Sequence, residues 1–226
     1  MKDSYRNWIG RLAAVTFAVS LISALFMTGT LAKYFVKASG YDTANIAKWG
    51  VEIDTSTLHD LFHTEYATDD HTYAGVMSVI SHNGDKVAAP GTRGHITDFS
   101  ITGTPAVPVR VAIMVDRSQS ALEGWVDGGG ASYEPILWTL TDGAGSAIVA
   151  GGTFDQLLDA LDAIHVDLPA NTDLSQSGVA LDGYTISWEW PFYVSAANDV
   201  RDTFLGKKLP APTATLVFDI VVAQID

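Results

Sequence analysis

Short runs of β-branched and aromatic residues, bounded by Gly, Pro, Asn or Asp, recur along most of the chain. Runs of this kind are typical of strands joined by turns. In the clearest one, Tyr184, Ile186, Trp188 and Trp190 alternate with smaller or polar residues, the two-residue period of a half-buried strand. The expected fold is mainly β, an antiparallel β-sandwich. The expected strands cover residues 47–53, 74–81, 94–101, 107–115, 136–140, 184–190 and 213–224.

One or two short helices are expected beside the strands. Thr153 and Gln156 have the spacing of a capping box, and apolar residues then recur every three or four positions up to Ile164. A shorter helix is predicted over 196–205, ending at Gly206. The glycine-rich stretch 143–152 is interpreted as turn and loop. The C-terminal run is apolar on both faces, which predicts a central strand of a sheet.

The N-terminus has the pattern of an export signal. Lys2, Arg6 and Arg11 precede an uncharged run over 12–32, and the small residues Thr30 and Ala32 fit a signal-peptidase site before Lys33. The alternative is an uncleaved membrane anchor, because a run of about 20 apolar residues also spans a bilayer. We therefore expect a signal peptide over 1–32 and one secreted domain over 33–226.

Composition removes several classes of protein. The 226 residues include 26 acidic and 13 basic side chains, a net charge of −13. A nucleic-acid partner is not expected, because such binding depends on clustered Lys and Arg. The chain has no cysteine, which excludes a disulfide framework, a thiolate zinc site and a thiol nucleophile.

Several short segments resemble the TasA/camelysin-like family of exported Gram-positive proteins. They are 29–34 (GTLAKY), 37–51 (KASGYDTANIAKWGV), 88–94 with 101–105, and 188–192 with 198–199 and 202–206. The resemblance implies a signal handled by a SipW-type peptidase and a jelly-roll-like sandwich at the cell surface or in the biofilm matrix. It also implies assembly into fibres with copies of itself, with a surface protein that nucleates assembly as a further candidate partner.

In such fibres, the resemblance implies, the freed N-terminal segment of one subunit adds a strand to the next. Lys33, Tyr34, Phe35 and Val36 form an aromatic and β-branched segment directly behind the predicted cut, so we expect them to be the donor strand. The alternative is that residues 33–39 pair with their own sheet or stay disordered.

The sharpest enzymatic pattern is His59-Asp60-Leu61-Phe62-His63. Two histidines four apart share one face of a helix and could hold zinc, with Asp60 as the general base, as in a metallo-endopeptidase. No third ligand has a distinctive spacing, so the competing interpretation is a surface helix with solvated histidines. Only this alternative requires a cofactor, zinc. The candidate third ligands are Glu65, Asp69, Asp70, His71, His82 and His95.

Two weaker patterns have structural explanations. Asp69-Asp70, and Asp199 with Asp202, are read as solvated turns because they lack the spacing of a calcium loop. Trp188 and Trp190 could stack on sugars in a monomeric adhesin, a third function hypothesis. They alternate in step with Ile186 and so lie on the same face of the strand, which favours the core instead.

Overall fold

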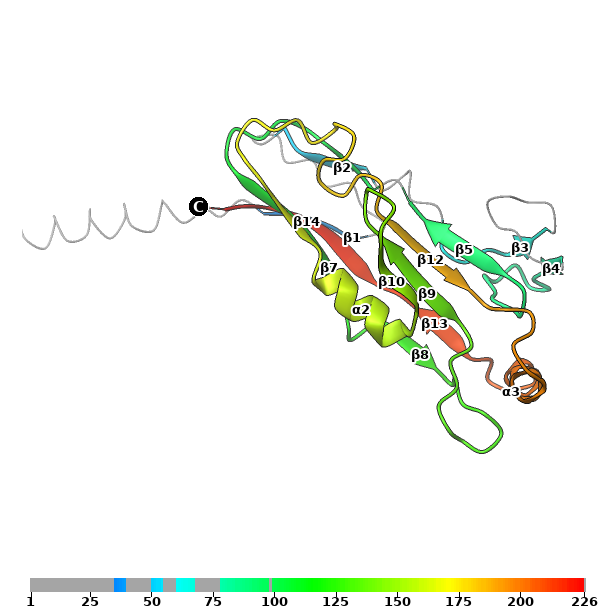
Figure 1. Ribbon diagram of the computed structural model, residues 1–226. Helices are drawn as coiled ribbons and strands as arrows, with labels where there is room; N and C mark the ends of the chain where they lie inside the picture. The colour runs from blue at the N-terminus through cyan, green and yellow to red at the C-terminus, as the bar shows by residue number, and fades with distance from the viewer. Residues whose placement is uncertain (1–34, 40–49, 55–59, 68–77, 98, 226) are drawn as a thin grey trace, which may run out of the picture. The chain divides into compact units, whose positions relative to one another are not determined.

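A computed structural model describes residues 35–39, 50–54, 60–67, 78–97 and 99–225. Residues 35–226 form one compact unit. Two four-stranded antiparallel sheets dominate it (Figure 1), which confirms the mainly β prediction. The first sheet has the order β1 (Phe35–Ser39), β14 (Phe218–Gln224), β7 (Val109–Val115) and β11 (His165–Leu168). The second has the order β10 (Ala147–Gly152), β9 (Leu137–Thr141), β12 (Thr185–Glu189) and β5 (Arg93–Ile96).

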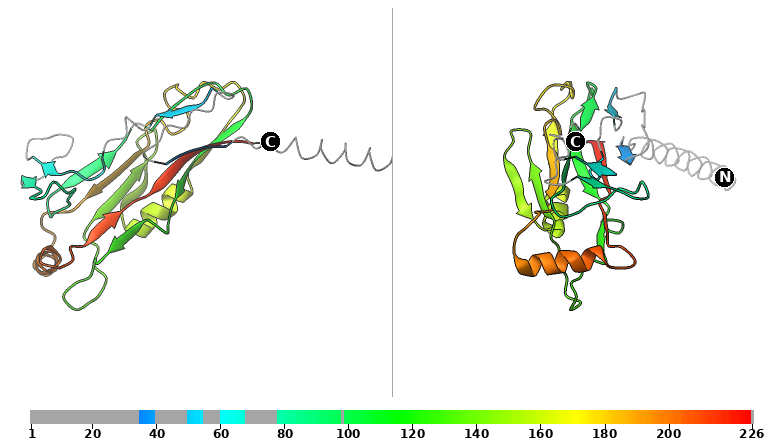
Figure 2. Two further views of the ribbon diagram at one scale, coloured as in Figure 1. Left: turned by 180° about the vertical axis from the view of Figure 1, so that it is seen from behind. Right: turned by 90° about the vertical axis from the view of Figure 1, so that its right-hand side faces the viewer.

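The connectivity is that of a jelly roll. Taken in chain order, the eight strands of the two sheets pair first with last, second with seventh, third with sixth and fourth with fifth. These pairs are β1 with β14, β5 with β12, β7 with β11, and β9 with β10. A long hairpin rolled over itself gives this order, with two Greek keys and two layers (Figure 2).

One hydrophobic core lies between the two sheets. On β7, Val109, Val111 and Ile113 are buried while Arg110 and Met114 are exposed, so the strand has the two-residue period of a half-buried strand. On β12, Ile186 and Trp188 are buried in the same core. β14 is a central strand, as its apolar sequence predicts, because it pairs with β1 on one side and β7 on the other.

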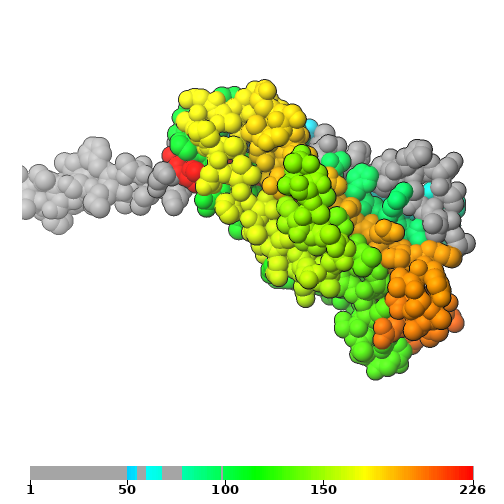
Figure 3. Space-filling view, viewed as in Figure 1, coloured from blue at the N-terminus to red at the C-terminus, as the bar shows by residue number. Residues whose placement is uncertain are grey.

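Both predicted helices are present. α2 (Phe154–Asp162) begins at Thr153, whose side chain accepts from the Gln156 N–H while the Gln156 side chain accepts from the Thr153 N–H. This confirms the capping box. α2 contacts β7, β9 and β10 through its apolar face. α3 (Ala196–Gly206) begins at the N-cap Ser195 and lies at the surface, orange in Figure 3.

Three short two-stranded pairs complete the unit. They are β2 (Glu52–Asp54) with β6 (Ser100–Thr102), β3 (Glu65–Tyr66) with β4 (Val79–Ile80), and β8 (Ala121–Glu123) with β13 (Thr213–Thr215). Among the described residues, no helix is long and apolar enough to cross a membrane.

Two segments that were each predicted as one continuous strand are divided into two strands in the structure. The run 94–101 is divided between β5 and β6, which belong to different sheets. The run 213–224 is divided between β13 and β14. At the second break, the Val217 N–H donates to Ser120 Oγ and the Val217 carbonyl accepts from the Asp116 N–H. A side-chain hydrogen bond thus replaces a main-chain bond between strands at Val217. The chain pairs with β8 before this residue and with β7 after it.

The glycine-rich stretch was also misassigned, because it contains the strand β10. Its register to β9 shifts between Val149 and Gly152, where Gly151 has a φ of +62°. Such a bulge requires a residue that tolerates positive φ, which glycine does without strain. Glycine content alone therefore did not indicate a loop.

Candidate functional site

The first candidate site is the edge of the sheet formed by β1 and β14. β1 is the end strand of its sheet, and its five residues pair antiparallel with β14, from Phe35 opposite Ala223 to Ser39 opposite Asp219. Phe35 and Val36 of the predicted donor segment are therefore paired with the same chain. This was the alternative considered for residues 33–39. Thr30, Ala32, Lys33 and Tyr34 lie outside the described residues.

β14 presents a well-packed surface to its edge partner. Ile220 and Val222 belong to the core, and Val221, on the opposite face, is only 5% exposed. One edge of β14 is occupied by β7 and the other by β1. A strand edge left open would present unpaired N–H and C=O groups to any extended segment. The position held by β1 is therefore one that a strand from another molecule could occupy with the same main-chain bonds.

The opposite edge of this sheet is charged. On β11, Asp167 accepts two hydrogen bonds from Arg110 of β7, at 2.6 Å from Nε and 2.7 Å from Nη2. The guanidinium lowers the pKa of Asp167, first through these hydrogen bonds and then through its charge. A charged side chain on an edge strand opposes pairing with other chains.

Residues 60–63 are not helical, so the zinc-binding helix and the surface helix considered for this segment are both wrong there. Asp60 lies in irregular structure, Leu61 and Phe62 in a bend, and His63 forms a β-bridge with Val87. Asp60 makes an ion pair with Lys86, at 2.5 Å between Oδ1 and Nζ. The one-face geometry required of an i, i+4 pair is absent from this part of the segment, and His59 lies outside the described residues.

The candidate third ligands that the structure describes, Glu65, His82 and His95, are not grouped into a metal site. Glu65 lies on β3 and His95 on β5, and His82 lies in a loop. Asp69, Asp70 and His71 lie outside the described residues. Within the part of the chain that the structure describes, no three His, Cys, Asp or Glu side chains are grouped so as to hold a metal ion.

Trp188 and Trp190 are core residues, which confirms the prediction from their parity. They are 2% and 6% exposed. The Trp188 ring lies 5.0 Å from that of Phe62, and the Trp190 ring lies 5.5 Å from that of Trp125. Buried rings cannot stack on a sugar in solvent, so these two side chains do not form an adhesin platform.

Asp202 has a structural role rather than that of a solvated turn. It accepts a hydrogen bond of 2.8 Å from the Tyr133 hydroxyl. Burial raises the pKa of Asp202, and the hydrogen bond from Tyr133 opposes that rise. Asp199, in the first turn of α3, suits the helix dipole. Both residues therefore lie in a helix rather than in a turn, and Asp202 helps to position α3 through its bond with Tyr133.

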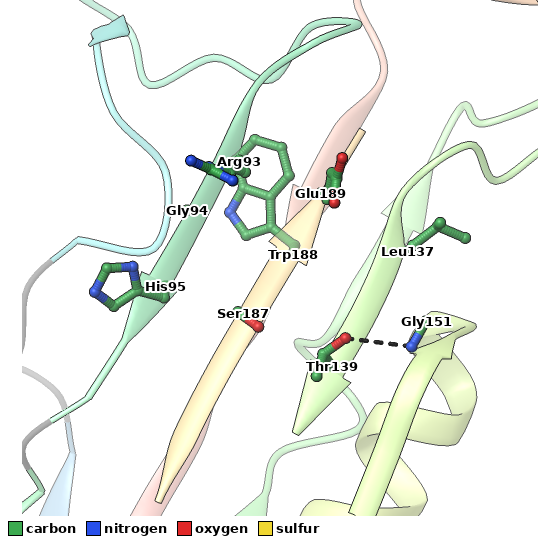
Figure 4. A pocket seen from close by; sticks show the side chains of 9 residues that line it. All are labelled: Arg93, Gly94, His95, Leu137, Thr139, Gly151, Ser187, Trp188 and Glu189. Atoms are coloured by element: carbon green, nitrogen blue, oxygen red, sulfur yellow. Dashed lines mark hydrogen bonds between the residues drawn. The ribbon is translucent and has the colours of Figure 1, made fainter. Parts of the chain in front are cut away.

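A polar groove on the second sheet is a site that sequence reasoning missed (Figure 4). It has a volume of about 430 Å³ and lies over β5, β12, β9 and β10. Its polar side chains come from alternate strand positions, opposite in direction to Ile186 and Trp188 of the core. They meet only through strand pairing, so no local sequence signal could have revealed them. They include Arg93, His95, Thr139, Ser187 and Glu189.

Comparison of the chain with protein-family models, with curated proteins and with solved structures gave no match.

Proposed function

We propose that the protein is a secreted structural subunit of extracellular fibres or of a biofilm-matrix layer at the surface of a Gram-positive-type bacterium. Subunits join by exchanging strand β1 after a SipW-type peptidase removes the signal. The observation that carries this proposal is the place of β1. It follows the predicted cleavage point directly, and it is an edge strand held by main-chain pairing to β14.

Exchange requires no new interface. If β1 of one copy replaces β1 of the next, every main-chain hydrogen bond to β14 is made again with an identical sequence. The net cost is mainly the entropy of association, which a high local concentration offsets. Each subunit then donates one strand and accepts one, a head-to-tail contact that does not close on itself and so produces filaments.

Cleavage would act as the switch in this scheme. A segment still joined to a signal peptide in the membrane cannot move into a neighbouring molecule. Removal of residues 1–32 leaves Lys33 as a free N-terminus next to β1. The resemblance to TasA-like proteins points to the same order of events.

Electron microscopy of the processed protein tests the proposal. The chain is expressed together with a SipW-type peptidase, and mass spectrometry establishes the new N-terminus. We expect fibres from this form, and none from a variant that carries a folded tag before Lys33. The tag leaves β1 and the core intact, so loss of fibres would not reflect misfolding.

A second variant lacks residues 33–39. We expect it to form no fibres, and a synthetic peptide of sequence 33–39 should bind it and restore its stability. Fibres of unchanged length and number from either variant would contradict the exchange of β1.

A further inference from the structure

We propose that the groove on the outer face of the sheet β10-β9-β12-β5 is a binding site for a neutral, polyhydroxylated saccharide chain. The groove has a volume of about 430 Å³, within the usual range for small-ligand sites. It belongs to the sheet that does not contain β1. This inference goes beyond the proposed function and does not depend on fibre formation.

Strand register arranges the lining of the groove in two rows. One row runs from Arg93 through Glu189 to Leu137, and the other from His95 through Ser187 to Thr139. Adjacent strands are about 4.8 Å apart, and successive outward residues along a strand are about 7 Å apart. The rows therefore form a regular grid of polar groups fixed by the sheet (Figure 4).

The bulge in β10 opens one side of the groove. Gly151 has no side chain to cover the floor, and its N–H donates to Thr139 Oγ1 at 3.2 Å. The Thr139 hydroxyl is thereby oriented, and its own hydrogen stays available to donate. The glycines that sequence analysis assigned to a loop thus have a role in shaping this surface.

Arg93 and Glu189 of the first row, and Ser187 of the second row, do not satisfy each other. Arg93 and Glu189 are opposite in register and both exposed. Among the described residues, the structure contains no ion pair or hydrogen bond from either side chain, nor any from the Ser187 hydroxyl. Arg93 supplies donors in a planar fork and Glu189 supplies acceptors, while Ser187 supplies both. Sugar hydroxyls, which donate and accept in adjacent pairs, match this combination.

Charge and topology distinguish a neutral saccharide from other chains. Arg93 and Glu189 balance each other, and the net charge of −13 opposes a polyanion. An extended peptide gains affinity by pairing with an open strand edge. The middle of this groove lies over β9 and β12, which are paired on both sides, so a peptide could pair only along the end strands β5 and β10 and not across the groove. Leu137, 42% exposed, offers an apolar contact to the C–H face of a sugar ring.

Nuclear magnetic resonance titration of the full chain with neutral tetrasaccharides tests this site. The probes are cellotetraose, laminaritetraose and tetra-N-acetylchitotetraose. We expect at least one to give saturable shifts confined to the amides of Arg93, Ser187, Glu189 and Thr139. Arg93→Ala and Glu189→Gln should each weaken that binding about 10-fold or more, as expected for hydrogen bonds to charged groups.

The matched control is Arg110→Ala, which removes an exposed arginine from β7 of the other sheet. It should leave saccharide binding unchanged. Because Arg93 and Glu189 are exposed, all three variants should unfold at similar temperatures. No saturable shift with any probe would overturn the proposal. So would equal affinity in Arg93→Ala and the wild type, or tighter binding of tetragalacturonate or of tetra-alanine.

Discussion

The indole N–H of Trp188 donates to the backbone carbonyl of Leu61 at 2.7 Å, across 127 positions of sequence and inside the core. This bond fixes the segment that includes Leu61 and Phe62 against β12. Phe62 then packs against Trp188 and also lies edge-on to Trp138, with ring centroids 6.3 Å apart. The segment is thus held by tertiary contacts rather than by a helix.

Gly94 is expected to be intolerant of any side chain because it lies beneath this contact. A Cβ at position 94 would overlap the Leu61 carbonyl oxygen and lie 2.8 Å from Trp188 Nε1. Gly94→Ala should therefore lower the free energy of unfolding by about 1–3 kcal/mol, the usual cost of overpacking. Urea unfolding followed by tryptophan fluorescence measures the change.

The control is Gly206→Ala at the end of α3. A Cβ at that position would meet no atom within 4 Å. Alanine is the better helix former, so stability should stay the same or rise by up to about 1 kcal/mol. Equal effects of the two substitutions on the free energy of unfolding would show that Leu61 and Trp188 do not lie as close to position 94 as described.

Tyr66→Phe should destabilise the protein through a lost hydrogen bond. The Tyr66 hydroxyl donates to the Val87 carbonyl at 2.8 Å and accepts from the His63 N–H at 3.0 Å. The side chain is buried, and burial raises the pKa of Tyr66 to about 12. Because both backbone partners would lose this contact, we expect a cost of about 1–3 kcal/mol.

Chemical denaturation of Tyr66→Phe should be compared with that of Tyr193→Phe. Tyr193 is 66% exposed, so removal of its hydroxyl should change the free energy of unfolding by less than about 0.5 kcal/mol. A neutral result for Tyr66→Phe would mean that these two bonds contribute nothing to stability.

Glu134→Gln should alter the pH dependence of stability. Glu134 Oε1 accepts from Trp138 Nε1 at 3.0 Å and from the Phe154 N–H at 2.6 Å. Burial raises the pKa of Glu134, while these two hydrogen bonds oppose the rise. The folded state therefore holds this proton more tightly than the unfolded state. The wild type loses stability as pH rises from the unfolded pKa, about 4.3, through the higher folded pKa.

Glutamine keeps an oxygen that can accept both bonds but does not ionise. The free energy of unfolding of the variant minus that of the wild type should consequently increase between pH 4 and pH 7. Denaturant titrations at both pH values measure this difference, in which the other carboxyls cancel. A difference that stays constant or decreases with pH would contradict the account of Glu134.

Much of the fold could be predicted because its signals are local. Runs of β-branched and aromatic residues placed β7, β9 and β12 within about two residues of their observed ends, and the capping box at Thr153 placed the start of α2. β10 was not predicted because its glycines, which form a bulge, were interpreted as a loop. β8 and β11 were not predicted either, because they are short.

The remaining features depend on contacts between distant residues. The helix expected at Asp60 and His63 is replaced by a bend because Trp188 and Tyr66 bind the backbone there. The groove could not be predicted, since strand register alone places Arg93 opposite Glu189. The pairing of β1 with β14 also joins the two ends of the described unit, which local pattern cannot specify.

Disulfide trapping tests the exchange of β1 most directly. Lys37 lies opposite Val221 in the register of β1 and β14, and paired strand positions have the spacing that a disulfide needs. The chain contains no other cysteine, so Lys37→Cys combined with Val221→Cys reports on this contact alone. Each single variant serves as the control.

The double variant is processed and assembled under reducing conditions, then oxidised and run on a denaturing gel without reductant. Exchange of β1 predicts a ladder of covalent dimers, trimers and longer chains from the assembled sample, and monomers only when oxidation precedes processing. Monomers alone from intact, oxidised fibres would show that β1 stays in its own subunit, and would contradict the account.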